Sequence, residues 1–84
     1  MMYSLFFKPS AVKSIKKLSE KDKQKVARVL ESLKTTPFSG KKLAGEYKDY
    51  YSLRVWPYRI IYTIIKKELV MLVVDVGHRQ SIYK

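Results

Sequence analysis

Two arginines flank a turn-forming dipeptide in the C-terminal half of this 84-residue chain, and their spacing suits the binding of a phosphate group. Arg54 and Arg59 lie on either side of Trp56-Pro57. If that dipeptide alone makes the turn of a hairpin, the two arginines face each other across the strands. Like charges in that position are destabilising unless an anion lies between them, so one interpretation of the spacing is a phosphate clamp. The alternative is two solvated arginines on an exposed sheet face, and a bulged turn of odd length would separate them.

The C-terminal end carries a second set of candidate residues. His78 is the only histidine of the chain. Histidine is the side-chain type that exchanges protons near neutral pH. His78 could equally stack on a base or form a hydrogen bond with the backbone. Arg79 is the next residue, and taken alone it is a surface cation. Gly77 can take positive φ, so strand alternation does not decide which of these two residues points into a site. Tyr83 could stack on a base or orient a 2′-OH, or it could pack onto the sheet as a terminal aromatic.

These residue types suit the cleavage of RNA through its own 2′-OH. In that reaction the 2′-oxygen attacks the adjacent phosphorus, which leaves a cyclic phosphate and a free 5′-OH. The reaction needs a base, an acid and positive charge on the phosphoryl oxygens. DNA lacks the 2′-OH and cannot react in this way.

The overall charge favours a polyanionic partner. Eighteen lysines and arginines against seven acidic residues give a formal net charge of +11, which is spread along the whole chain. Lys16 and Lys17 lie on the polar side of a predicted helix, where they form a solvated surface or bind RNA backbone. Lys48 and Trp56 are further candidates for RNA contact, although Trp56 could instead pack against its loop.

The composition also limits cofactors and location. With no cysteine and one histidine, neither a disulfide framework nor a protein metal site is expected, and no cofactor is implied. No stretch approaches the roughly 20 apolar residues of a membrane span. We therefore expect a cytoplasmic protein with no membrane partner.

A single α+β domain over residues 1–84 must position these side chains. Residues Tyr3–Phe7 predict a strand, and Pro9 begins a short helix. Ser19 followed by Asp22 resembles a capping box and predicts the start of a second helix, antiparallel to the first, which ends near Thr35-Thr36-Pro37.

The remainder of the chain predicts mainly strands. Residues Pro37–Asp49 are typical of a loop. Three β-branched and aromatic runs then predict a three-stranded antiparallel meander, with both helices on one face of the sheet: Tyr51–Val55, Tyr58–Ile65 and Leu69–Val76.

The segment from Tyr51 to Tyr62, together with the ending Val76-Gly-His-Arg-Gln-Ser-Ile-Tyr-Lys84, resembles the RelE/ParE family of toxins from toxin-antitoxin modules. The order of elements agrees with that family across nearly the whole chain. The resemblance implies a RelE-like, small-ribonuclease-like fold. It implies either a ribosome-dependent messenger-RNA endonuclease, as in the RelE branch, or a gyrase inhibitor, as in the ParE branch. A homologue without activity that serves only in an antitoxin-repressor complex is a third possibility.

The resemblance also implies partners and roles for residues. The partners would be a cognate antitoxin, the ribosome and messenger RNA. The functional arginines would fall on Arg54, Arg59 and Arg79, and the C-terminal tyrosine on Tyr83. Some RelE enzymes carry lysines on the strand before the first arginine, where this chain has Tyr50 and Ser52, and this leaves the general base open. Lys48 is the nearest lysine.

Overall fold

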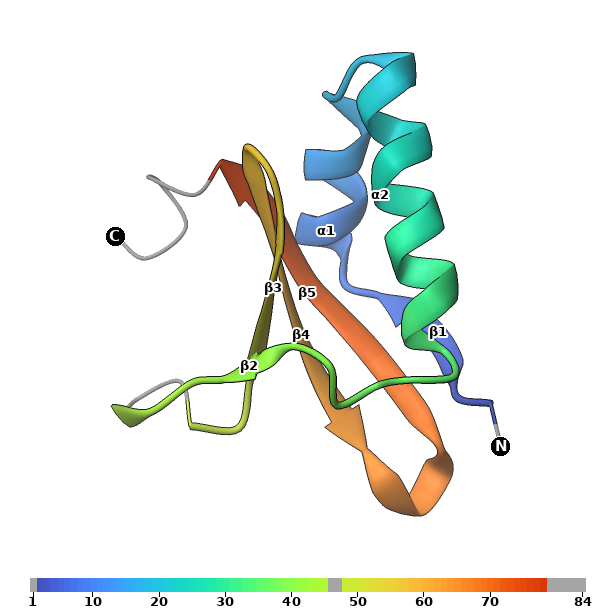
Figure 1. The fold of residues 1–84 in the computed structure, drawn as a ribbon, viewed down its shortest axis with the longest axis vertical. Coiled ribbons are helices and arrows are strands. Elements are labelled where there is room, and N and C mark those ends of the chain that lie inside the picture. The colour runs from blue at the N-terminus through green and yellow to red at the C-terminus, as the bar shows by residue number, and fades with distance from the viewer. Residues whose placement is uncertain (1, 46–47, 79–84) are drawn as a thin grey trace.

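A mixed five-stranded sheet with two helices on one face forms the fold in the computed structural model of the chain, which describes residues 2–45 and 48–78 (Figure 1). The strands lie in the order β1-β5-β4-β3-β2 across the sheet. All neighbouring strands are antiparallel except β1 and β5, which are parallel. The elements in chain order are β1 (Ser4–Phe7), α1 (Pro9–Lys16), α2 (Glu20–Leu33), β2 (Lys41–Lys42), β3 (Tyr51–Val55), β4 (Tyr58–Ile65), a 3-10 turn (Lys66–Glu68) and β5 (Val70–His78).

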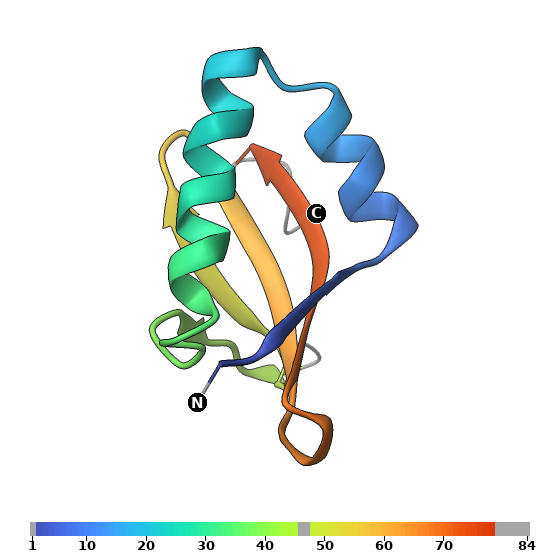
Figure 2. The ribbon, with the colours of Figure 1, turned by 90° about the vertical axis from the view of Figure 1, so that its right-hand side faces the viewer.

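Both helices begin where the sequence predicts. Pro9 occupies the first turn of α1, where its missing N–H costs nothing. Ser19 caps α2, since its side-chain oxygen accepts a hydrogen bond from the Asp22 N–H at 3.2 Å. The helices run in opposite directions over the same face of the sheet, with α1 on β5 and α2 toward β3 (Figure 2). The predicted α+β class and the placement of both helices on one face are confirmed.

The hairpin between β3 and β4 also forms as predicted. The two-residue turn consists of Trp56 and Pro57, which are joined by a cis peptide bond. The flanking residues Val55 and Tyr58 pair with each other. The last strand is longer than the predicted Leu69–Val76, because β5 begins at Val70 and extends to His78. Leu69 has a φ of 54° and ends the 3-10 turn, so it cannot be part of the strand.

The predicted loop over residues Pro37–Asp49 is wrong at one point, where Lys41–Lys42 pair with β3 as the edge strand β2. The buried side chain of Tyr62 explains why. Its hydroxyl donates to the Pro37 carbonyl at 2.9 Å and accepts from the Gly40 N–H at 3.0 Å, which ties this segment to the sheet. A Cβ atom at Gly40 would lie 2.5 Å from the Tyr62 hydroxyl oxygen, so only glycine fits there.

The core lies between the helices and the sheet. The largest fully buried side chains belong to both layers: Val26, Leu33, Ile60, Tyr62, Met71 and Val73. Burying a side chain of this size contributes about 1.5–3 kcal/mol. Tyr51 stacks on Tyr62 with ring centroids 5.5 Å apart, and both Tyr51 and Tyr58 pack against this core. In the part of the chain that the structure describes, no helix is long and apolar enough to cross a membrane.

We predict that Tyr62→Phe lowers the free energy of unfolding by about 1–3 kcal/mol, because two backbone groups lose their hydrogen-bond partner in a buried place. Burial raises the pKa of the Tyr62 hydroxyl, with the bond from Gly40 acting in the opposite direction. Denaturant unfolding measures the effect. Tyr3→Phe is the matched control, since its ring also packs against the core without these two bonds. Equal losses in the two variants would contradict the anchoring role of the hydroxyl.

Candidate nucleic-acid interface

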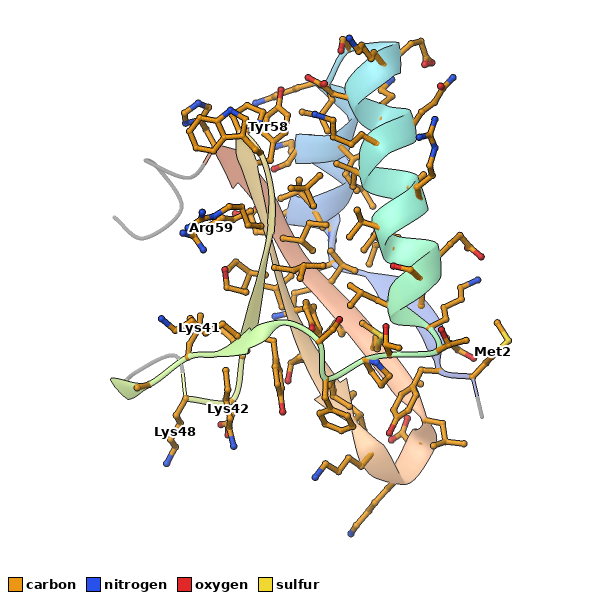
Figure 3. The ribbon with its side chains drawn as sticks, in the orientation of Figure 1. Met2, Lys41, Lys42, Lys48, Tyr58 and Arg59 are labelled. Atoms are coloured by element: carbon orange, nitrogen blue, oxygen red, sulfur yellow. The ribbon has the colours of Figure 1, made fainter. Side chains whose placement is uncertain are left out.

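The pleat of the sheet places Arg54 and Arg59 on the face away from the helices. The two residues pair directly in register, so their side chains share one face. Tyr58, the residue directly before Arg59 on β4, points the other way. Its hydroxyl donates a hydrogen bond to the Asp22 carboxylate of α2 at 2.7 Å. In Figure 3 the Arg59 side chain points away from both helices. We call the sheet face that carries Ser52, Arg54 and Arg59 the arginine face.

The arginine pair has the geometry that the spacing predicts. Because the turn consists of Trp56 and Pro57 alone, no bulge separates Arg54 from Arg59. Arg54 is exposed and Arg59 is partly buried. Two guanidinium groups on adjacent strands repel each other unless an anion lies between them. The pair therefore has the positive charge and the hydrogen-bond donors that a phosphate site requires.

Ser52 orients one of the two arginines. Its side chain is buried on the arginine face, and its hydroxyl accepts a hydrogen bond from Arg59 Nη1 at 3.3 Å. Ser52 lies on β3 two residues before Arg54 and pairs with Ile61 of β4. The bond restricts the guanidinium to the arginine face, so less side-chain entropy remains to be lost in any further contact.

His78 lies on the other side of the sheet from the arginine pair. It pairs with Tyr58, while Gly77 pairs with Arg59, so alternation places the imidazole on the helix side. The rings of His78 and Tyr58 meet edge to face with centroids 6.4 Å apart. The hydrogen bond to Asp22 raises the pKa of the Tyr58 hydroxyl, and burial and the carboxylate charge act in the same direction. The structure thus brings Arg54 and Arg59 together but does not place His78 beside them.

The hairpin tip is a separate exposed site. The side chain of Trp56 is 58% exposed there. The Lys25 ammonium of α2 donates a hydrogen bond to the Trp56 backbone carbonyl at 3.0 Å, and this bond connects the hairpin tip to the helix layer. An exposed indole offers a face on which a base can stack.

The other predicted lysines lie away from the arginine pair. Lys16 ends α1 and Lys17 caps it, and both are exposed on the helix layer. Lys48 is exposed in the connection before β3, and its side chain in Figure 3 points away from Arg59. Arg79 and Tyr83 lie outside the described residues, so their roles stay predictions.

One cation on the arginine face was missed by reasoning from the sequence. Lys41 of β2 pairs with Ser52, so its side chain shares the face of Ser52 and Arg59. Figure 3 shows Lys41 and Arg59 on the same side of the sheet. The only sequence signal is that Lys41 follows a glycine within a basic dipeptide, and this does not distinguish a strand from a loop.

The sequence matches, over residues 5–83, the family model described as the ParE toxin of the type II toxin-antitoxin system parDE. It is also 28% identical over 87 residues to RelE4 of Methanocaldococcus jannaschii, which is described as a toxin. That match covers 99% of this chain and 93% of the relative.

Solved structures share the fold. The RelBE2 toxin-antitoxin complex from Mycobacterium tuberculosis contains a chain with a TM-score of 0.87 and 26% identity, and the match covers 94% of this chain and all (100%) of that one. The isolated RelE toxin of E. coli has a TM-score of 0.79 and 28% identity, with 96% of this chain and 90% of that one covered.

Proposed function

This chain belongs to the RelE/ParE family of toxins of type II toxin-antitoxin systems, and on that premise we propose that it is an endoribonuclease that cuts messenger RNA on the ribosome and so inhibits translation. The observation that carries the proposal is the Arg54–Arg59 pair on the arginine face. An RNA-cleaving enzyme needs positive charge where the phosphoryl oxygens gain charge in the transition state.

In this proposal the substrate provides the nucleophile. The 2′-OH attacks the adjacent phosphorus, and the bond from phosphorus to the 5′-oxygen of the next nucleotide breaks. Arg59, held by Ser52, binds a phosphoryl oxygen. Arg54 is exposed beside it and binds the phosphate from the neighbouring strand. Both can donate two parallel hydrogen bonds, which lysine cannot do.

The resemblance to the family extends the assignment to the C-terminal residues. Arg79 is proposed to neutralise the reacting phosphate or the leaving group, and Tyr83 to stack on a base or orient the 2′-OH. His78 is proposed to assist proton transfer. Because its ring lies on the Tyr58 side, it would act on RNA that passes around the end of β5.

A second function is kept because the matching family model is named after the ParE toxin. In that case the chain would bind and inhibit gyrase without cutting RNA. The two functions differ in the target and in the product, so one assay series separates them.

A cognate antitoxin is the proposed partner in either case. The similar M. tuberculosis chain was solved within a toxin-antitoxin complex. The net charge of +11 favours an acidic or amphipathic antitoxin segment that lies across the helices or the sheet.

We predict that the purified protein cuts messenger RNA on programmed ribosomes and leaves the same RNA largely intact in free solution. The described residues contain no strong acid-base pair on the arginine face, so the ribosome must orient the substrate, an effect worth several kcal/mol, on the order of a thousandfold in rate. Cleavage is followed on gels with labelled message, and gyrase supercoiling is measured in parallel. Equal cleavage of free RNA would contradict the ribosome requirement, and gyrase inhibition without any cleavage would replace the proposed function with the second one.

A further inference from the structure

Within residues 2–45 and 48–78, three cations lie on the arginine face, each on a different strand. Arg59 is on β4, Arg54 on β3 and Lys41 on β2. The register fixes this arrangement, because Lys41 pairs with Ser52 and Arg54 pairs with Arg59. Residues that pair directly point to the same face, and so do residues two apart on one strand. The three side chains therefore form a row that crosses the sheet from its centre to its β2 edge.

The spacing of this row exceeds the size of one phosphate group. With strands roughly 4.8 Å apart and a rise of roughly 3.3 Å per residue, the Cα of Lys41 lies about 8 Å from that of Arg54 and about 12 Å from that of Arg59. Arg54 and Arg59 are direct neighbours and can share one phosphate. Lys41, one strand further and two residues along, reaches the next group of a bound polyanion.

The position of Lys41 is held by the fold rather than by its own short strand. Residues Pro37 and Gly40 are both tied to the buried hydroxyl of Tyr62. On the other side, Leu43 donates its N–H to the Tyr50 carbonyl at 3.0 Å. Two anchors thus flank Lys41, while its side chain is exposed. A cation held in this way loses little backbone entropy when it binds.

We propose that Lys41 binds the RNA phosphate adjacent to the one held by Arg54 and Arg59, and so sets the path of the message across the arginine face. The inference rests on the proposed function. Contacts of this kind position a nucleic acid without reading its sequence. Lys41 is therefore a positioning residue that acts on substrate binding, whereas the arginine pair acts on the reacting phosphate.

Lys42 provides a matched control one residue away. It has the same charge and is also exposed. It pairs with Tyr51, so its side chain belongs to the face opposite that of Lys41. In Figure 3 the Lys42 side chain extends downward, away from Arg59.

The test compares Lys41→Ala, Lys41→Arg and Lys42→Ala with the wild-type protein in cleavage of message on programmed ribosomes. We expect Lys41→Ala to raise the protein concentration needed for half-maximal cleavage about tenfold, and to reduce the slope of its logarithmic salt dependence by about one, since one phosphate contact is lost. The rate at saturation should change little. Lys41→Arg should restore the wild-type concentration, and Lys42→Ala should stay within about twofold of wild type.

The possible outcomes separate this inference from the function on which it rests. If the wild-type protein cleaves and the two variants Lys41→Ala and Lys42→Ala are equally affected, the role of Lys41 is overturned. The proposed function is unaffected by that result. Failure of Lys41→Arg to restore binding would also overturn it, because the loss would not be one of charge. Wild-type protein that does not cleave would overturn the proposed function and this inference together. Thermal unfolding of each variant shows whether the fold is kept.

Discussion

Replacing Arg59 by alanine should slow single-turnover cleavage on saturated ribosomes by about a hundredfold or more, while affinity for the ribosome changes little. The guanidinium lies on a central strand, paired with Arg54 and held by Ser52. A donor fixed in this way stabilises charge that grows in the transition state without having to reorganise. Its loss therefore appears in the rate and not in binding. Arg79→Ala is expected to behave in the same way.

Two comparisons make this result specific. The double variant Lys16→Ala, Lys17→Ala should do the reverse, weakening docking and flattening its salt dependence, because both lysines are exposed on the helix layer. Arg59→Lys keeps the charge but loses the planar pair of donors, so it should recover only part of the rate. Unfolding measurements exclude a folding defect. Full cleavage by Arg59→Ala on saturated ribosomes would show that the arginine pair is not the phosphate site.

The hairpin at the centre of the site could be predicted from local sequence alone. Runs of β-branched and aromatic residues on both sides of Trp56-Pro57 predict the strands, and a two-residue turn fixes the register. The opposition of Arg54 and Arg59 follows from those two facts. A bulged turn of odd length is the alternative that the local sequence leaves open, and the observed register excludes it.

The edge strand β2 could not be predicted in the same way. Lys41 and Lys42 have low strand propensity, and their pairing depends on Tyr62, which lies about twenty residues further along the chain. A long-range contact of this kind leaves no local pattern. The same holds for β1, whose parallel pairing with β5 joins residues from the two ends of the chain.

The side of the sheet that His78 occupies depends on a bulge. Ile61 pairs with Asp75 but Tyr62 pairs with Val73, so Val74 has no partner on β4. Simple alternation from the start of β5 would place His78 on the arginine face, because Val70 pairs with Ile65 on that face. The extra residue reverses the direction of every side chain after it. The continuous apolar run that predicts the strand carries no sign of where the bulge occurs.

Removing the 2′-OH at the cleaved nucleotide should also have a large effect on the cleavage rate. A message that carries a single 2′-deoxy nucleotide at the cleaved position should bind on the ribosome as the all-ribose message does and remain uncut. The reason is that the proposed nucleophile is the 2′-oxygen of the substrate itself. The backbone phosphates that the arginine pair and Lys41 would contact are unchanged in that message.

The most direct test of the account is therefore single-turnover cleavage of these two messages on programmed ribosomes, with the ends of the products analysed. The account predicts that the all-ribose message is cut once per ribosome to give a cyclic phosphate and a free 5′-OH. It predicts that the deoxy message is not cut at a measurable rate. Cleavage of the deoxy message at a similar rate, or of neither message, would contradict it.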